Sequence, residues 1–410
     1  MVVYGHRSLD AMQIREAARG WCDLIWLVDG EDPSAAAVLP LLRRFGVVVD
    51  ALGASPKDAA EALRAHSPDG LTTFYDTGME HIAAIAGELG LAFHTPEVAL
   101  GLEDKLYQRK ALRSAGLPTP RTVALPPGAN RATVEQIGSA ISYPAVLKPR
   151  RASGSWHTFK VAGLEDLGER WEELAAEGPE AMIVEEYLSD GPDMPGGFEA
   201  GYVSVETVAV AGQMTHLAIT GRFPLAFPFR ETGFFIPATL PSEQAAEVVD
   251  LAGRTLRGLG IETGAAHTEI KLTAEGPRVI EVNGRIGGGV PEMLRLATRV
   301  DIVKLTMRAA LGRPTELAEL PATSGVAYRF FYQPPSSARR LNAIDGLDEL
   351  KAQPGVESIV MHSPPGTEID ARDGTRTYLF AIVGSAADYD GVLAIDGFLR
   401  TGITAVYDHA

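Results

Sequence analysis

The segment from Ala265 to Gly289 carries the most specific arrangement of side chains in this chain of 410 residues. Residues 265–272 and 278–283 alternate polar with apolar residues, a period of two that is typical of β-strands with one buried face. The residues between them, 273–277, read TAEGP and have turn-forming composition. We therefore predict a β-hairpin, and the hairpin determines which side chains of the segment meet.

Two glutamates face each other in this hairpin. If it is symmetric about Glu275, Glu269 lies directly opposite Glu281, on the neighbouring strand and on the same face. Asn283 lies two residues further along and points the same way. Two carboxylates and an amide oxygen suit Mg²⁺ or Mn²⁺, whereas two carboxylates without a cation would repel each other. From the hairpin alone, a pair of solvated glutamates at a sheet edge is an equal alternative.

The residues that follow the second strand favour the metal site. Arg285 comes two residues after Asn283, and a glycine run follows at Gly287, Gly288 and Gly289. Arginine pairs with carboxylates and phosphates, and a glycine run exposes backbone N–H groups that bind anions. We therefore expect Arg285 to act on negative charge in catalysis, and the three glycines to contribute to substrate binding.

The order His-x-Glu (His267, Glu269), then Glu-x-Asn-x-Arg (Glu281, Asn283, Arg285), resembles the Mg·ATP site of the ATP-grasp superfamily. The resemblance implies ATP and Mg²⁺ (or Mn²⁺) as cofactors, with Glu269, Glu281 and Asn283 as metal ligands. It also requires two phosphate-binding lysines and a hinge glutamate, in a fixed order before the hairpin.

Two lysines precede the hairpin in that order. Lys105 lies in the stretch 102–116, which we predict to be one helix because Gly116 is a suitable C-terminal stop and Pro118 follows it. Lys148 ends a short buried strand in YPAVLKP. The resemblance assigns both lysines to the ATP phosphates and makes Lys148 part of the catalytic set. Without it, Lys105 would be an ordinary solvated helix residue.

A loop of small residues, 150–157, follows Lys148. Small residues at a bend let backbone N–H groups approach phosphates, and the resemblance implies that the loop closes over the ATP phosphates. Its small residues are Ser153, Gly154 and Ser155. Trp156 and His157 occupy the far side, where small residues are more common in the family, and this puts a freely mobile loop in doubt. The chain contains no GxxxxGK[ST] sequence, which excludes a P-loop.

The strand in AMIVEEYLSDG, residues 181–191, resembles the hinge that binds adenine. The resemblance implies that Glu185 accepts from the adenine amino group, and that backbone groups of Glu186 and Leu188 pair with the ring. The acid that usually binds the ribose is replaced by Tyr202. Asp193 and Glu199 are the candidates for that contact, which stays unassigned.

Three further residues belong to the predicted large lobe. Arg222 lies where related proteins carry a basic residue that faces the phosphates, so the resemblance places it at ATP. Glu206, in VSVET, points into the lobe and would serve substrate or metal. His267 lies on the strand face of Glu269 and would line the pocket of the amino substrate, although a structural core histidine is nearly as good an interpretation.

The remaining segments predict a multidomain protein of α/β and α+β class. Residues 1–95 alternate β-like and helical runs, which predicts a parallel sheet with helices on its faces. We expect a linker helix at 96–120, an ATP-grasp small lobe at 121–199 and a large lobe with the metal site at 200–315. Residues 316–410 return to strands and form a C-terminal α+β cap.

Bulk composition limits the partners and the compartment. The net charge is −16, with 37 Lys and Arg against 53 Asp and Glu, which disfavours nucleic acid and anionic membranes. A single cysteine, Cys22, excludes an internal disulfide framework and suits the cytoplasm. The first residues lack the apolar core of a signal peptide, and no uncharged apolar run reaches the length of a membrane span. A homodimer is common in the family.

The resemblance points to the L-amino-acid ligase branch of the ATP-grasp superfamily. It implies that a carboxylate attacks the γ-phosphate of ATP to give an acyl phosphate, which an amine then converts to an amide. The partners would be small carboxylate and amine substrates. The alternatives are a carboxylase that uses bicarbonate and a non-catalytic nucleotide-binding protein. Biotin carboxylase has Gln and Glu where this chain has Gly287 and Gly289, which argues against the carboxylase.

Overall fold

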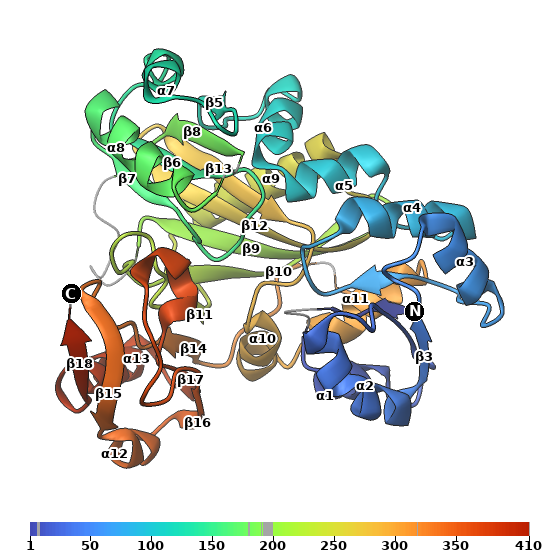
Figure 1. Cartoon of the computed structure of the whole chain (residues 1–410). Coiled ribbons are helices and arrows are strands. Elements are labelled where there is room, and N and C mark those ends of the chain that lie inside the picture. Colours follow the sequence, from blue (N-terminus) through green and yellow to red (C-terminus); the bar gives the residue numbers. More distant parts are fainter. Residues whose placement is uncertain (6–8, 179–180, 190, 192–199, 318, 410) are drawn as a thin grey trace.

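A computed structural model describes residues 1–5, 9–178, 181–189, 191, 200–317 and 319–409. Figure 1 shows the N-terminal segment on one side of a large twisted sheet, the C-terminal segment on the other, and a smaller lobe above the sheet. The mixed α/β and α+β architecture predicted from the sequence is confirmed.

The N-terminal segment forms a four-stranded parallel sheet in the order β3-β2-β1-β4. Each strand and each helix lies where the alternation of β-like and helical runs predicts it. Short apolar strands alternate with amphipathic helices because each helix buries one face on the sheet. The strands are β1 (Val2–Val3), β2 (Ile25–Val28), β3 (Val47–Asp50) and β4 (Thr72–Thr73), and the helices are α1 (Ala11–Ala18), α2 (Pro33–Phe45), α3 (Pro56–Arg64) and α4 (Met79–Leu89).

The helix predicted over 102–116 is wrong in its extent. The chain forms two helices, α5 (Pro96–Glu103) and α6 (Lys105–Ser114), which are separated by Asp104. Asp104 has extended backbone angles, and its side chain accepts hydrogen bonds from two N–H groups of the first turn of α6. An aspartate at this position caps a new helix, so Lys105 becomes the first residue of α6.

The small lobe is an antiparallel sheet in the order β5-β8-β6-β7, covered by two helices. Its core is apolar and centres on Leu147, Val184 and Trp171. The strands are β5 (Thr122–Leu125), β6 (Ala145–Pro149), β7 (Phe159–Val161) and β8 (Met182–Glu186), and the helices are α7 (Arg131–Gly138) and α8 (Leu164–Ala175).

An eight-stranded sheet in the order β13-β12-β9-β10-β11-β14-β17-β16 runs through the large lobe into the C-terminal segment. The sheet crosses the domain limit expected near residue 315, because β11 pairs with β14. The limits themselves stay predictions. The strands are β9 (Tyr202–Val210), β10 (Gln213–Arg222), β11 (Gly233–Ile236), β12 (Gly264–Thr273), β13 (Gly276–Asn283), β14 (Val326–Phe331), β16 (Val356–Met361) and β17 (Phe380–Ala386).

The two faces of this sheet differ in chemistry. One face is apolar and packs on α9 (Ser242–Leu259), through side chains such as Val205, Ile270 and Val282. The other face carries the intervening residues of the same strands, and many of these are charged. Since side chains alternate between the faces of a strand, the period of two places the charged residues on the face opposite to the α9 core. Part of that second face is apolar as well, because Val208 and Ala265 pack in the core shared with the N-terminal segment.

The other elements surround the sheet. The sequence predicted the four α-helices among these elements in outline, but missed the 3₁₀ helix η1 and one strand, β15. The elements are α10 (Val290–Thr298), α11 (Ile302–Ala310), β15 (Ala338–Asp345), α12 (Leu347–Lys351), the 3₁₀ helix η1 (Ala371–Thr377), α13 (Tyr389–Thr401) and β18 (Thr404–His409). In the described part of the chain, no helix is both long and apolar enough to span a membrane.

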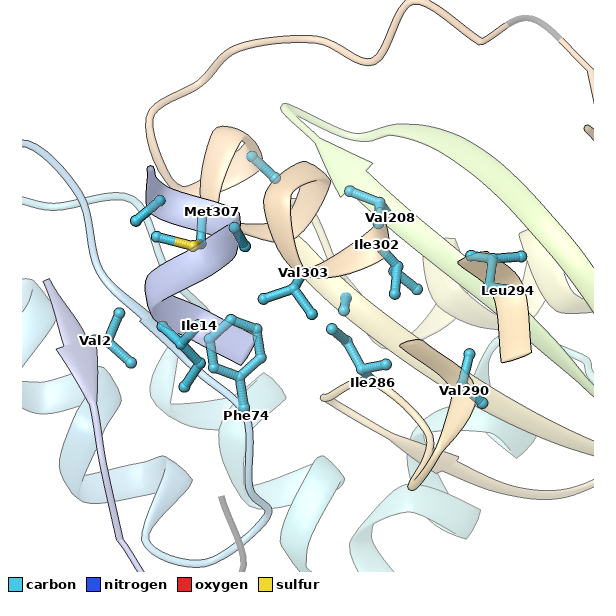
Figure 2. Packing of buried hydrophobic residues seen from close by; sticks show 14 of the residues in the cluster. Val2, Ile14, Phe74, Val208, Ile286, Val290, Leu294, Ile302, Val303 and Met307 are labelled. Atoms are coloured by element: carbon cyan, nitrogen blue, oxygen red, sulfur yellow. The ribbon is translucent and has the colours of Figure 1, made fainter. Parts of the chain in front are cut away.

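A continuous apolar core joins the N-terminal segment to the large lobe. Figure 2 shows Ile14 of α1 and Phe74 beside Val303 and Met307 of α11, with Ile286 and Val290 continuing the cluster toward the large sheet. Because this core spans both parts, it fixes the loop after β4 against the segment that follows the β12–β13 hairpin.

Candidate active site

The hairpin β12–β13 places Glu269 opposite Glu281, as the sequence predicts, but not for the reason assumed. The turn contains only Ala274 and Glu275, since Thr273 pairs with Gly276. Near the turn, the hairpin is therefore symmetric about the point between Ala274 and Glu275, and not about Glu275 as predicted. A register shift next to Glu269 restores the expected pairing, so the two carboxylates meet because a β-bulge compensates for the tighter turn.

The predicted metal ligands share the polar face of the sheet. His267 pairs with Asn283 and Glu269 with Glu281, so the four side chains form two adjacent rows. Glu269, Glu281 and Asn283 all line a cavity of about 520 Å³. Its walls come from the small lobe, the large sheet, the loop after β4 and β14.

Lys148 and Glu185 form a buried ion pair at the back of the cavity. A third charged residue, Arg109, completes this group and was not predicted from the sequence. Arg109 is fully buried on α6 and donates from Nε to Glu185 Oε2 at 3.1 Å. Burial alone would raise the pKa of Glu185, but Arg109 and Lys148 outweigh it and lower that pKa to about 2. Burial also lowers the pKa of Lys148, and Glu185 opposes this shift.

Arg109 connects three parts of the site. Besides Glu185, its guanidinium donates to the carbonyl of Ile280, the residue beside Glu281. The adjacent Gln108 bonds to both the N–H and the carbonyl of Val282. Helix α6 is therefore attached to the hinge strand and to the hairpin at once, and this attachment positions Lys105 near the metal ligands.

Lys105 is buried, not solvated. Its Nζ donates to the carbonyl of Ala152 at 2.6 Å and lies 3.5 Å from Glu281 Oε1. Lys105 and Lys148 thus reach the same cavity from different elements, as the family resemblance implies.

The loop of small residues bends where the sequence predicts. Gly154 and Ser155 have positive φ, and both line the cavity with Ser153. The loop is fastened to the C-terminal segment, because Gly154 accepts from Thr375 N–H and His157 N–H donates to the Arg372 carbonyl, both at 2.9 Å.

The far side of this loop is occupied by two aromatic rings. Trp156 stacks on His157 with ring centroids 3.8 Å apart, and His157 lies 3.5 Å from Glu177. These rings and the backbone bonds to η1 hold the loop in place. The structure thus accounts for the loop's departure from the small-residue pattern of the family.

The hinge residues Glu186 and Leu188 line the other end of the cavity, beside Val146 and Ile280. Glu186 is held by Arg278 at 2.8 Å and by the Arg121 N–H at 3.1 Å. Val146, Leu188 and Ile280 are apolar, so this part of the cavity, the apolar slot, suits a planar base. The candidates for the ribose contact, Asp193 and Glu199, lie outside the described residues.

A second buried charge network lies under the polar face. Glu206 is fully buried, does not line the cavity, and contacts His267 Nδ1 with both oxygens at 2.9 Å. In this structure its carboxylate supports His267, and its predicted service to substrate or metal stays a prediction. Burial alone would lower the pKa of His267, but Glu206 outweighs it and raises that pKa to about 9.

Arg222 and His267 lie on either side of Glu269, a predicted metal ligand. Arg222 lies 3.8 Å and His267 Nε2 3.4 Å from Glu269 Oε1. Nε2 is also 3.0 Å from Arg222, a contact that suits a neutral imidazole, but we favour the imidazolium because the buried Glu206 requires a cation beside it. Burial would raise the pKa of Glu269, yet His267 and Arg222 outweigh it and lower that pKa to about 2. Arg222 also pairs with Glu231.

Arg285 lies in the cavity wall and is paired with a residue that the sequence analysis missed. Its Nε donates to Asp76 Oδ2 at 2.7 Å, across 209 positions of sequence. Asp76 follows β4 at the carboxyl end of a parallel strand, where functional residues of α/β sheets gather. That position was the available signal. The N-terminal segment, which by sequence said little about chemistry, therefore contributes directly to the site through Phe74, Asp76 and Thr77.

The glycine run makes close approaches possible. A Cβ added to Gly287 would lie 2.6 Å from Nδ1 of His267, and one added to Gly289 would lie 2.6 Å from Nη1 of Arg329. Gly289 has a φ of +77° and caps α10. Gly288 has open space beside it, and both Gly288 and Gly289 line the cavity.

The donor set fits a hard divalent cation. Glu269 and Glu281 supply anionic oxygens, and Asn283 supplies an amide oxygen on the same face. Among the described residues, no three His, Cys, Asp or Glu side chains form a cluster that would hold a metal by themselves. Such a site suits a cation that also binds phosphate oxygens, as Mg²⁺ does.

The comparison with known families agrees with this geometry. A profile described as "ATP-grasp domain" matches residues 141–292, from the strand that bears Lys148 to the start of α10. This chain contains an ATP-grasp domain. The matched range includes the three predicted metal ligands, Lys148 and the loop of small residues.

Three relatives are similar in sequence to this chain. An uncharacterized protein, y4rH, from Sinorhizobium fredii is 29% identical over 79% of this chain and 66% of its own length. Carnosine synthase 1 from Mus musculus is 30% identical over 56% of this chain and 29% of its own. Alanine–anticapsin ligase from Bacillus subtilis is 26% identical, with 54% and 49% covered. The chain thus spans between 29% and 66% of the length of these relatives.

Two solved structures share the whole fold. An L-amino acid ligase from Bacillus licheniformis superimposes with a TM-score of 0.76 at 22% identity, covering 100% of this chain and 98% of the other. The biotin carboxylase domain of a 2-oxoglutarate carboxylase from Hydrogenobacter thermophilus, solved with MgADP, ADP and bicarbonate, gives 0.69 at 17% identity, with 98% and 91% covered. At these identities the likeness shows the fold alone.

Proposed function

We propose that this chain is an ATP-dependent carboxylate–amine ligase that forms an amide bond through an acyl phosphate. The observation that carries the proposal is the meeting of two lysines, three hard-oxygen donors and Arg285 in one cavity. Relatives named carnosine synthase and alanine–anticapsin ligase support amino acids as substrates. A cytoplasmic location and a homodimer stay predictions of the sequence.

The residues divide the work of phosphoryl transfer. Lys105 and Lys148 would neutralise phosphate charge, and the backbone at Ser153, Gly154 and Ser155 would cover the phosphates. The apolar slot beside Glu186 and Leu188 would receive adenine, with Glu185 at its back. Mg²⁺ held by Glu269, Glu281 and Asn283 would supply charge neutralisation at the phosphates.

The chemistry requires no nucleophile from the protein. An oxygen of the substrate carboxylate attacks the γ-phosphorus, and the bond to the bridging oxygen breaks, which gives acyl phosphate and ADP. The amine then attacks the acyl carbon, phosphate leaves, and an amide remains. Arg285 would stabilise the negative charge of the acyl phosphate and of the tetrahedral state. Asp76 holds the Arg285 side chain in place for that role.

The test is formation of ADP and phosphate from Mg·ATP with amino acids supplied singly and in pairs, with products identified by mass. We expect turnover that requires both an acid and an amine, and a product with their summed mass less one water. Glu281→Gln should abolish turnover, whereas Glu275→Gln, the same change in the exposed turn of the hairpin, should not. Binding of ATP without turnover with any pair would contradict the proposal and favour a nucleotide sensor.

Use of bicarbonate is the second enzymatic possibility, because carboxylases share the fold. The environment of the glycine run disfavours it. Side chains at Gly287 and Gly289 would collide with His267 and Arg329, so Gln and Glu at these two positions would require both neighbours to move. Bicarbonate-dependent ADP formation without an amine would establish the carboxylase instead.

A further inference from the structure

A third arginine, Arg329, lines the cavity from β14, which is five strands along the sheet from β13 and its slot residue Ile280. It lies on β14, directly opposite Phe234 of β11, and Phe234 in turn lies opposite Arg222 of β10. The side chains therefore form one row across the polar face of the sheet. Phe234 occupies the middle of this row, with the guanidinium of Arg222 5.2 Å from the centre of its ring, and Arg329 ends the row.

The Arg329 guanidinium is only partly satisfied. Its Nη1 donates to Glu292 Oε2 at 3.1 Å, and its charged group lies 5.4 Å from the centre of the Phe331 ring. Its Nε is buried and has no hydrogen-bond partner among the described residues. A guanidinium carries five N–H donors in a planar fork, and a buried donor without a partner costs stability. The arrangement leaves donors free for a planar anion.

Neighbouring residues hold Arg329 ready for such a ligand. Glu292 is itself held by Gln13 Nε2 at 2.9 Å, so the counter-ion is fixed from the N-terminal segment. Gly289 allows the arginine to lie against the start of α10, since any Cβ there would be 2.8 Å from the Arg329 Cδ. The rigid placement of an arginine favours bidentate binding of a carboxylate.

The position of Arg329 determines which carboxylate it would bind. Strands β12 and β14 are separated by four steps of the sheet, or about 19 Å between backbones at the usual strand spacing. The carboxylate to be phosphorylated must lie near the metal ligand Glu269 on β12. Arg329 reaches into the cavity from the other side, so it meets a second carboxylate beyond the reacting centre.

We propose that Arg329 binds the free carboxylate of the amine substrate, so that the acceptor is an amino acid and not a simple amine. The inference rests on the ligase function proposed above and names its second substrate class. Val290, Phe331 and Tyr378 line the same end of the cavity, and they would contact the apolar part of that amino acid.

The kinetic test compares each accepted amino acid with its carboxamide and its decarboxylated amine, in wild type, Arg329→Gln and Arg329→Lys. Wild type should prefer the amino acid to its carboxamide. Arg329→Gln should lower kcat/KM for the amino acid about 100-fold, as expected for loss of a charged bidentate contact. The same variant should leave kcat/KM for the carboxamide nearly unchanged. Arg329→Lys, which keeps the charge, should lie between. Arg308→Gln is the matched control, because Arg308 also pairs with one glutamate and has an unpartnered Nε, but does not line the cavity.

A partial reaction separates the two substrates. Hydroxylamine traps the acyl phosphate as a hydroxamate without any amino-acid acceptor, so this rate should be unchanged in Arg329→Gln. A fall in trapping with dicarboxylic donors alone would mean that Arg329 binds the second carboxylate of the donor, and would overturn the proposal. Equal losses for the acid and the carboxamide would also overturn it. Failure of trapping with every acid in wild type would instead contradict the ligase function.

Calorimetry tests the inference without turnover. Glycine, alanine, leucine and phenylalanine, each with its carboxamide, would be titrated into protein with Mg²⁺ and a non-hydrolysable ATP analogue. Wild type should bind at least one acid about 10-fold more tightly than its carboxamide, and Arg329→Gln should lose that preference. No preference for any acid in wild type would overturn the proposal. Thermal unfolding of the variants checks that they remain folded.

Discussion

The two faces of the eight-stranded sheet are built from alternate residues of the same strands, yet they do different work. On β12, Thr268 and Ile270 point to α9 and the apolar core, whereas His267 and Glu269 point to the cavity. The apolar face contributes free energy of folding in proportion to buried area. The polar face carries the charged side chains that line the cavity, and ion pairs between these side chains stabilise their charged forms. Substitutions on the two faces should therefore change different measured quantities.

The largest expected effect is on the polar face. Glu281→Gln should lower kcat/KM for ATP about 10⁴-fold, or about 5 kcal/mol, because it removes an anionic metal ligand at the phosphates. Its melting temperature should stay within a few degrees of wild type. Steady-state kinetics and thermal unfolding of the same sample measure both. A large fall in melting temperature would mean that Glu281 stabilises the fold. It would contradict the idea that residues of the polar face affect activity and not stability.

Arg109 sharpens the comparison, since it is charged but fully buried. Arg109→Met should destabilise folding by about 4 kcal/mol, because it leaves Glu185 buried with one cation fewer. Denaturant unfolding measures this change. Arg113→Met, one turn further along α6 and exposed, is the control and should change stability by less than about 0.5 kcal/mol. Equal changes in the free energy of unfolding would show that the buried Arg109 contributes no more to stability than the exposed Arg113.

The apolar face should respond in stability alone. Ile270 is fully buried against α9, and Ile270→Ala should cost about 3 kcal/mol through lost transfer energy and a residual cavity. The activity of the folded fraction should be unchanged. Val360→Ala, on the exposed edge strand β16, is the matched control with little expected change. Loss of activity in folded Ile270→Ala would show that the faces are coupled.

The last expected effect, no larger than that of Ile270→Ala, is the pH dependence of the buried His267–Glu206 pair. The pKa of His267 is raised from 6.5 to about 9 in the folded state. Its contribution to stability is therefore fully present below pH 6.5 and is lost as the pH rises through 9, with a limit of about 3 kcal/mol. Denaturant unfolding between pH 6 and 10, with a chelator present, measures it. His267→Gln should remove the dependence; if it persists, another group is responsible.

Prediction from sequence succeeded where the interaction is local. The β12–β13 hairpin brings Glu269 and Glu281 together within 13 residues, and alternation alone shows that both belong to one face. It failed where a single residue decides the backbone. Asp104 divides one predicted helix into two because its side chain caps α6. The bulge beside Glu269 was not predicted, because the sequence pattern indicated which residues pair across the hairpin but not the length of its turn.

By itself, the sequence determined the strand faces, the order of the lysines and metal ligands, and the resemblance that these residues carry. The tertiary structure decided which charges are paired. Arg285 with Asp76 and Arg109 with Glu185 are 209 and 76 positions apart, and Arg329 reaches the cavity only because β14 joins the large sheet. The physical reason is that strand periodicity acts over a few neighbouring residues. A pair between distant residues exists only once the apolar core around Phe74, Ile286 and Met307 has packed (Figure 2).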